Sequence, residues 1–339
     1  MIRKFPAPHI RKEQNGELIF PHVLIALAPC YVAAVYYYGI RALFLIAFGM
    51  ITFTVSDFLC VRFFRKEIYV WDAGSLVSGA ILTLILPPTI SIWTLLIGVL
   101  FASVIVKQCF GGLGSNLFNP ALAASAFLSI AFPTQVSTYA EPISSRFVFS
   151  SLLTGPVDAI SSATPTMTGG ETGIFELLSG RYSGAMGETC TILILISGVY
   201  LVRQGILRVQ APIAYLAVVF AGYWLVSGAG ASLNGAWVSI ITGGVIFGAV
   251  FAMGDYTTTP VSRLGRIFFG IGAGLLTLLI QRFGNPSFAV GFSILAMNLV
   301  TPILDLYIRP RVFSKPVWHA PSAAAANDTE NLHQQVENV

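Results

Sequence analysis

Long apolar segments separated by short polar ones occupy most of this chain. Several are close to the lower limit of about 17 residues for a helix that spans the hydrocarbon core of a bilayer. The third and fifth segments are shorter and end at Pro87-Pro88 and at Pro133, which indicates tilted or partial helices packed inside the protein. The pattern predicts an all-α polytopic membrane protein with about ten transmembrane helices. The ten segments lie at about residues 22–38, 41–60, 72–86, 90–107, 119–132, 188–202, 211–227, 236–253, 264–281 and 288–306.

The composition agrees with this prediction. Of the 339 residues, 55% are hydrophobic and only 10% are charged, whereas soluble domains carry about 25% charged residues. The net charge of +4 comes from basic residues scattered in short loops, so no nucleic-acid partner is expected. The four cysteines are far apart and form no CxxC pair, which indicates neither a zinc site nor a disulfide framework. The polar, basic first twenty residues have no apolar core typical of a cleavable signal peptide.

The distribution of Lys and Arg predicts the orientation, because cytoplasmic loops carry an excess of basic residues. With the N-terminus in the cytoplasm, 15 of the 19 basic residues fall on the cytoplasmic side. Both termini are then cytoplasmic, and the longest polar segment, residues 133–187, is extracytoplasmic. The expected divisions are a cytoplasmic segment (1–20), a first five-span repeat (21–132), an extracytoplasmic segment (133–187), a second five-span repeat (188–308) and a cytoplasmic tail (309–339) with a disordered end. The four basic residues outside are Arg41, Arg146, Arg181 and Arg282.

A weak internal repeat supports the division into two halves. Asn119-Pro120 opens the fifth segment and Asn285-Pro286 opens the tenth. Two halves of five spans must be inverted relative to each other, because five is odd. Inverted repeats with interrupted helices place binding sites near the middle of the bilayer. Alanine follows four positions after each Asn (Ala123, Ala289) and a small residue six positions after (Ser125, Gly291).

The glycine-rich stretch before the fifth segment is a candidate binding element. Glycines let backbone N–H groups approach a ligand closely, and a helix that begins at Asn119 offers its positive end to an anion. The alternative is a re-entrant turn between two spans. An aquaporin-like pore is not indicated, because a second Asn-Pro-Ala is missing. The candidate residues are Gly111, Gly112, Gly114, Asn116 and Asn119.

Acidic residues mark further candidates. Asp255 precedes three threonines in the stretch 254–260, and an acid among hydroxyls can coordinate a hard cation or hold a polar cofactor. A capped helix end is the alternative. Asp72 and Glu188 stand at the starts of spans, where acids are costly and often functional, although both could lie at the membrane interface. Charge counting places 111–119 and 254–260 on the cytoplasmic side, so we expect them to form one site.

The stretch from Asp158 to Pro165, within the extracytoplasmic segment, carries four hydroxyl-bearing or acidic side chains in eight residues. It contains Ser161, Ser162 and Thr164, and small residues beside Thr164 leave its hydroxyl accessible to a bulky group. A plain Ser/Thr-rich loop is the alternative, since loops favour these residues.

Taken together, these stretches resemble the RnfD/NqrB family of membrane subunits of ion-translocating redox complexes. The resemblance runs from Pro8 to Asp305 and is most specific at Ser161–Thr164, where the family has Ser/Thr-Gly-Ala-Thr. Ser162 replaces the usual glycine, and Gly254 and Tyr256 replace the family's Thr-Asp-Pro pattern around the acid. The other matching stretches are Asp72–Ser75, Leu86–Pro88, Gly111–Asn116, Phe118–Ala121 and Gly187–Thr189.

The resemblance implies a function. Family members help to pass electrons between reduced ferredoxin and NAD while Na+ or H+ moves across the bacterial cytoplasmic (inner) membrane. Thr164 would carry FMN through a phosphoester, and some members also hold a non-covalent riboflavin. No NAD fingerprint or iron–sulfur cysteine cluster occurs here, so those reactions would belong to partner membrane, flavin and iron–sulfur subunits. A flavin transferase would attach the FMN. The competing hypothesis is a channel or secondary transporter without a redox cofactor.

Overall fold

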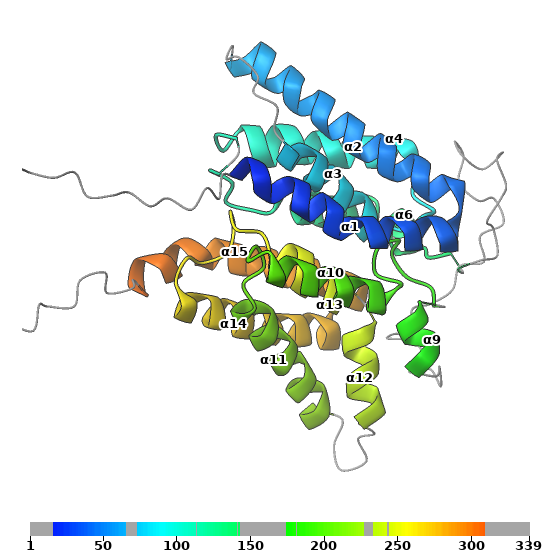
Figure 1. Ribbon diagram of the computed structural model, residues 1–339, viewed down its shortest axis with the longest axis vertical. Coiled ribbons are helices and arrows are strands. Elements are labelled where there is room, and N and C mark those ends of the chain that lie inside the picture. The colour runs from blue at the N-terminus through cyan, green and yellow to red at the C-terminus, as the bar shows by residue number, and fades with distance from the viewer. Residues whose placement is uncertain are drawn as a thin grey trace, which may run out of the picture.

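The computed structural model describes residues 16–65, 73–112, 114–140, 142, 174–180, 182–226, 233–242 and 244–308. The regular elements in these ranges are helices, as the apolar pattern predicts (Figure 1). The predicted flavin-attachment residues Asp158, Ser161, Ser162 and Thr164 lie outside the described residues, and so does Asp72.

The helices fall into two groups in chain order, α1 to α6 and α9 to α15 (Figure 1). The first group is α1 (Gly16–Tyr38), α2 (Ile40–Cys60) with η1 (Val61–Arg65), α3 (Ala73–Ile85), α4 (Ile92–Leu100) with η2 (Phe101–Gln108), α5 (Pro120–Ala131) and α6 (Pro133–Ser137). The second is α9 (Ile174–Ser179), α10 (Thr191–Arg203), α11 (Gln210–Val226), α12 (Leu233–Ile241), α13 (Val245–Phe247) with η4 (Gly248–Ala252), α14 (Arg263–Phe283), η5 (Pro286–Phe288) and α15 (Ala289–Tyr307).

The lengths of the apolar helices fit a multi-pass membrane protein. Within the described ranges, four helices are long and apolar enough to cross a bilayer, namely Ile19–Tyr38, Ile40–Phe63, Arg263–Phe283 and Pro286–Tyr307. The third and fifth predicted segments form the short helices α3 and α5, of 13 and 12 residues. Their expected shortness is therefore confirmed.

The eighth apolar segment differs from its prediction. The sequence predicts one span over 236–253, but α12 ends at Ile241 and the chain turns before α13. Gly244 adopts the left-handed conformation at the turn, with φ of 73°. A Cβ atom there would lie 2.1 Å from Oε1 of Glu188. This is a turn that glycine accommodates and that hydrophobicity alone does not reveal.

Small residues allow close packing within the second group. Gly270 and Gly274 of α14 lie against α11, and a Cβ atom on Gly270 would meet the carbonyl oxygen of Ala211 at 2.4 Å. This is the small-xxx-small spacing that brings helix backbones together in membranes. The two groups meet where α1 packs on α10 and where α5 packs on α15.

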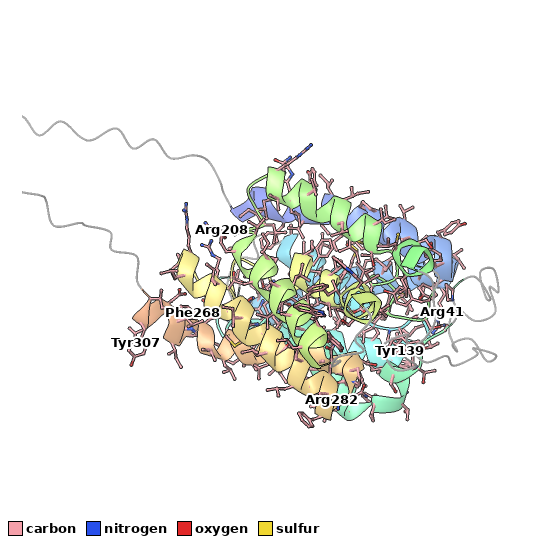
Figure 2. All side chains as sticks on the ribbon, turned by 90° about the horizontal axis from the view of Figure 1, so that it is seen from below. Arg41, Tyr139, Arg208, Phe268, Arg282 and Tyr307 are labelled. Carbon is pink, nitrogen blue, oxygen red and sulfur yellow. The ribbon has the colours of Figure 1, made fainter. Side chains whose placement is uncertain are left out.

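The described chain begins and finishes at the same end of the molecule. The start of α1 and the end of α15 lie together, and α9 lies at the opposite end (Figure 1). Figure 2 places Arg208 and Tyr307 at the first end, and Arg41, Tyr139 and Arg282 at the other.

Two buried arginines donate hydrogen bonds to backbone carbonyl oxygens that lie beyond the ends of helices. Arg41 is 6% exposed and donates hydrogen bonds to the carbonyl oxygens of Pro88 (2.6 Å) and Ile90 (2.7 Å), which follow α3. Arg266 is 5% exposed and donates to the carbonyl oxygen of Pro260 at 2.9 Å, beyond η4. Backbone groups that leave a helix at membrane depth need such partners, because lipid supplies none.

Candidate functional site

A cavity at the start of α5 brings together three of the seven predicted binding residues that the structure describes, Asn116, Asn119 and Asp255. We call it the α5 cavity. It contains about 720 Å³ of space free of atoms, its open mouth included. Its wall is mostly aliphatic, with three aromatic side chains and a few polar groups. Those used below are Phe20, Lys107, Asn116, Asn119, Asp255 and Tyr256.

Asn119 joins the two stretches that the sequence places on one side. Its Oδ1 accepts hydrogen bonds from the N–H groups of Ala121 (3.0 Å) and Leu122 (3.4 Å) and so caps α5, with Pro120 in the first turn. Its Nδ2 donates to Oδ2 of Asp255 at 3.3 Å. The structure therefore brings together side chains that are 136 residues apart in the chain.

Asp255 is held by its own loop, which connects η4 to α14. Its Oδ1 accepts from the N–H of Thr257 at 3.1 Å and from the hydroxyl of Thr257 at 2.8 Å, and its Oδ2 accepts from the hydroxyl of Thr258 at 3.4 Å. Burial raises the pKa of the Asp255 carboxyl, and the hydrogen bonds from Thr257 and Thr258 act in the opposite direction. This carboxyl is a fixed acceptor in the cavity wall.

The glycine-rich stretch shapes the entry to α5 and does not line the cavity. Gly111, Gly112 and Gly114 have φ values of 114°, 88° and 88°, which favour glycine. They end η2 and turn the chain so that Asn116 reaches the wall. Asn116 is 8% exposed, and its Oδ1 is buried with no hydrogen-bond donor among the described residues. A buried acceptor without a partner is unfavourable unless a ligand or water supplies a donor.

Lys107 is a wall residue that the sequence assigns only to the cytoplasmic side. Just 2% of its side chain is exposed, and its Nζ lies 2.9 Å from Oδ2 of Asp57. Ser75 bonds to both partners, at 2.6 Å to Asp57 and 2.7 Å to Lys107, and Gln108 donates to Oδ1 of Asp57. The sequence contains one indication of this ion pair, namely a single Asp and a single Lys within apolar segments.

Glu188 lies apart from Asp255, in a second cavity at the start of α15, which we call the α15 cavity. It contains about 600 Å³ of space free of atoms, its mouth included. Its polar wall residues come from α5, from the chain after α6, from the chain before α10 and from η5. They are Ser125, Ser129, Tyr139, Glu188 and Ser287.

The start of α15 resembles that of α5. Oδ1 of Asn285 accepts a hydrogen bond from the N–H of Ser287 at 3.1 Å, and Pro286 follows the cap. Each of the two Asn-Pro pairs therefore begins a helix, the α-helix α5 at Asn119 and the 3-10 helix η5, which leads into α15, at Asn285. Ser125 and Gly291, each six positions after its Asn, lie where α5 packs on α15.

Apolar helices long enough to cross a bilayer, together with broken helices beside polar cavities, indicate a multi-pass helical membrane protein. The chain belongs to the NQR2, RnfD, RnfE family, whose model matches residues 4–314. The four cysteines form no disulfide in the structure.

Its relatives are similar over nearly their whole length. The protein of Acetobacterium woodii that is named as the D subunit of the Na(+)-translocating ferredoxin:NAD(+) oxidoreductase complex is 35% identical, over 91% of this chain and 93% of the relative. The D subunit of the proton-translocating ferredoxin:NAD(+) oxidoreductase complex of Clostridium ljungdahlii is 32% identical, over 91% and 94%. The D subunit of the ion-translocating oxidoreductase complex of Stutzerimonas stutzeri is also 32% identical, over 91% and 94%.

Proposed function

We propose that this chain is the D-type membrane subunit of an ion-translocating ferredoxin:NAD oxidoreductase complex. It relays electrons between partner subunits while Na+ or H+ crosses the bacterial inner membrane. The observation that carries the proposal is full-length membership in a family whose relatives bear these names, at 30–35% identity. Its partners would be the other membrane, flavin and iron–sulfur subunits.

FMN bound covalently to Thr164 through a phosphoester is the proposed redox group. The support is the sequence Ser161-Ser162-Ala163-Thr164 in the longest polar segment of the chain. FMN supplies the electron chemistry, and the protein supplies position and electrostatics. The covalent bond would keep the flavin on the outer face, where a freely diffusing flavin would be lost.

Loss of the attachment hydroxyl tests this proposal. Thr164→Ala, produced together with a flavin transferase, should eliminate flavin fluorescence from the denatured band under ultraviolet light. Ser161→Ala is the matched control and should reduce the signal only in part, because its hydroxyl does not form the bond. A Thr164→Ala band as bright as wild type contradicts the assignment. A dark wild-type band in the presence of the transferase favours the channel or transporter hypothesis.

The α5 cavity is the proposed place for a second, non-covalent flavin of the riboflavin type. Phe20 and Tyr256 form aromatic wall, with ring centroids 6.0 Å apart. Asn116 offers an acceptor without a donor, and Lys107 and Asn119 offer polar N–H groups. A flat ring with alternating donors and acceptors along one edge matches this wall. The residues present therefore fit such a group.

The proposed topology has ten crossing helices in two inverted repeats, with both termini in the cytoplasm. Arg41 and Arg282, assigned outside by charge counting, lie at one end of the molecule, and Arg208 lies at the other (Figure 2). The two Asn-Pro helix starts support the repeat. In a cysteine-free variant, a cysteine at Ser144 should react with a membrane-impermeant thiol reagent on intact spheroplasts. Reaction only after lysis contradicts this orientation.

A further inference from the structure

The carboxylate of Glu188 differs from those of Asp57 and Asp255 in having no partner among the described residues. Asp57 is bonded to Lys107, Ser75 and Gln108, and Asp255 to Asn119 and two threonines. Within the described ranges, the Glu188 carboxylate takes part in no hydrogen bond or ion pair. Glu188 is only partly exposed, in the wall of the cavity, and a carboxylate with reduced access to water and no charged partner is stabilised when a cation binds beside it or a proton binds to it.

The surrounding wall offers oxygen atoms and, among its described residues, no cation. Ser125 and Ser129 donate their hydroxyl protons to the carbonyl oxygens of Leu122 (2.8 Å) and Ala126 (2.7 Å). Their oxygen lone pairs are therefore not consumed by these bonds. The hydroxyl of Ser287 is buried without a hydrogen bond of good geometry among the described residues. Tyr139 adds a fourth hydroxyl.

The backbone is shaped around this carboxylate. Gly244 is also part of the wall, and a Cβ atom on it would lie 2.1 Å from Oε1 and 3.1 Å from Oε2 of Glu188. Only a glycine leaves room for the carboxylate there. The break between α12 and α13, which the apolar pattern does not predict, thus gives Glu188 its place in the cavity.

The net charge of the cavity wall indicates the charge of the cation that it can bind. One carboxylate with neutral hydroxyls gives a site of charge −1, which a single monovalent cation neutralises. Divalent Ca2+ favours six to eight oxygen ligands, several of them commonly carboxylates, and the described wall supplies one carboxylate. We propose that the α15 cavity binds one monovalent cation, Na+ or H+, at Glu188. This inference does not depend on either flavin.

The location fits exchange with the outer side of the membrane. Tyr139 lies at the same end of the molecule as Arg41 and Arg282 (Figure 2). That end is opposite Arg208 and Tyr307, where the chain enters and leaves the described region. The ionisable side chains that interact with Glu188 include Tyr38, Tyr139 and Tyr182. They are neutral at ordinary pH, so they do not neutralise its charge.

Infrared difference spectroscopy of the purified complex tests the proposal, because it separates ionised from protonated carboxyl groups. One arm titrates NaCl against choline chloride at fixed pH, and the other titrates pH without Na+. If Na+ is the ligand, the carboxylate bands shift with Na+ and saturate. If H+ is the ligand, the carboxyl C=O band titrates with pH and is insensitive to Na+. Glu188→Gln should remove whichever signal is observed.

A milder variant, Ser287→Ala, tests the same proposal if the Glu188→Gln protein does not assemble. Ser287→Ala should weaken Na+ or shift the proton midpoint by roughly 3- to 10-fold, as expected for one lost polar contact of about 0.5–1.5 kcal/mol. Ser137→Ala is the same change outside the cavity, on a hydroxyl bonded to the carbonyl oxygen of Pro133, and should have no effect. Absence of any cation-dependent carboxyl signal in wild type, or equal effects of the two serine variants, overturns the proposal.

Discussion

The two cavities begin from the same local device and differ in how their acids are held. Each lies at a helix start capped by an Asn-Pro pair, at Asn119 for α5 and Asn285 for α15. In the α5 cavity, Asp255 receives hydrogen bonds from three side chains and one backbone N–H. In the α15 cavity, Glu188 receives none from the described residues.

This difference in hydrogen bonding suggests different roles for the two acids: Asp255 can orient a ligand, and Glu188 can bind a cation. A carboxylate whose oxygens already accept hydrogen bonds from its own loop is held in one position and can orient a polar ligand. Few of its lone pairs remain to coordinate a mobile cation. An acid without partners is unfavourable until a cation arrives and is therefore suited to bind and release one. The α5 cavity is thus suited to a positioned cofactor and the α15 cavity to an exchangeable ion.

The largest effect should come from breaking the buried ion pair beside the α5 cavity. Lys107→Met leaves Asp57 as an unpaired buried charge, and loss of one partner of such a pair costs about 3–5 kcal/mol. The double variant Asp57→Asn/Lys107→Met should recover much of this loss. Unfolding titrations of the solubilised protein measure both. A double variant as unstable as the single one would show that the pair is not an isolated unit.

Removal of the saturated acid should have the next largest effect. Asp255→Ala leaves donors on Asn119 and Thr257 without an acceptor, at about 1–3 kcal/mol for each buried group that stays unsatisfied. The retained non-covalent flavin should fall with it, as measured after acid extraction of the purified complex. Unchanged stability and flavin content would mean that water replaces the carboxylate and that the cavity does not depend on it.

The two caps allow a matched comparison. Asn119→Ala and Asn285→Ala each remove a helix cap worth about 1 kcal/mol. Asn119→Ala should cost more, because it also removes the donor to Asp255. Unfolding free energies of the two variants, measured side by side, check the order. An equal loss would indicate that the 3.3 Å contact with Asp255 contributes nothing.

The smallest effect on stability should follow replacement of Glu188 by a neutral residue. Glu188→Gln replaces the carboxyl group without breaking a hydrogen bond to a described residue, so without Na+, and at a pH low enough to keep the wild-type carboxyl protonated, stability should change by no more than about 0.5 kcal/mol, as at sites without a specific interaction. At a pH at which the wild-type carboxylate is ionised, the variant should be the more stable protein, because it lacks the unpaired charge. A loss of more than about 2 kcal/mol would reveal a partner for the ionised carboxylate.

The sequence predicts the helices better than their connections. Length and hydropathy suffice for the long helices, and the prolines after α3 and α5 mark the short ones. The turn at Gly244 is missed because it lies within an apolar run and depends on a close approach by Glu188, which is distant in sequence.

The candidate site is predictable in part for a similar reason. Asn119 and Asp255 are placed on one side by counting charges, and the structure brings them into contact. Counting charges places Lys107 on the cytoplasmic side, but a single sequence does not show that Asp57, 50 residues earlier, is its partner. The position of Glu188 at the start of a span marks it as a candidate, but its cavity also includes residues of α5 and η5, which are distant in sequence.

Thermal unfolding with and without cation tests the contrast between the two cavities most directly. A ligand that binds only the folded state raises its stability in proportion to the logarithm of its concentration above Kd. Wild type and Asp255→Asn should both gain stability as Na+ replaces choline, or as pH is lowered through the titration of Glu188, and Glu188→Gln should lose this increment. The increment should be equal in the first two proteins even if their baselines differ. Persistence of the increment in Glu188→Gln, or its loss in Asp255→Asn, would contradict the account.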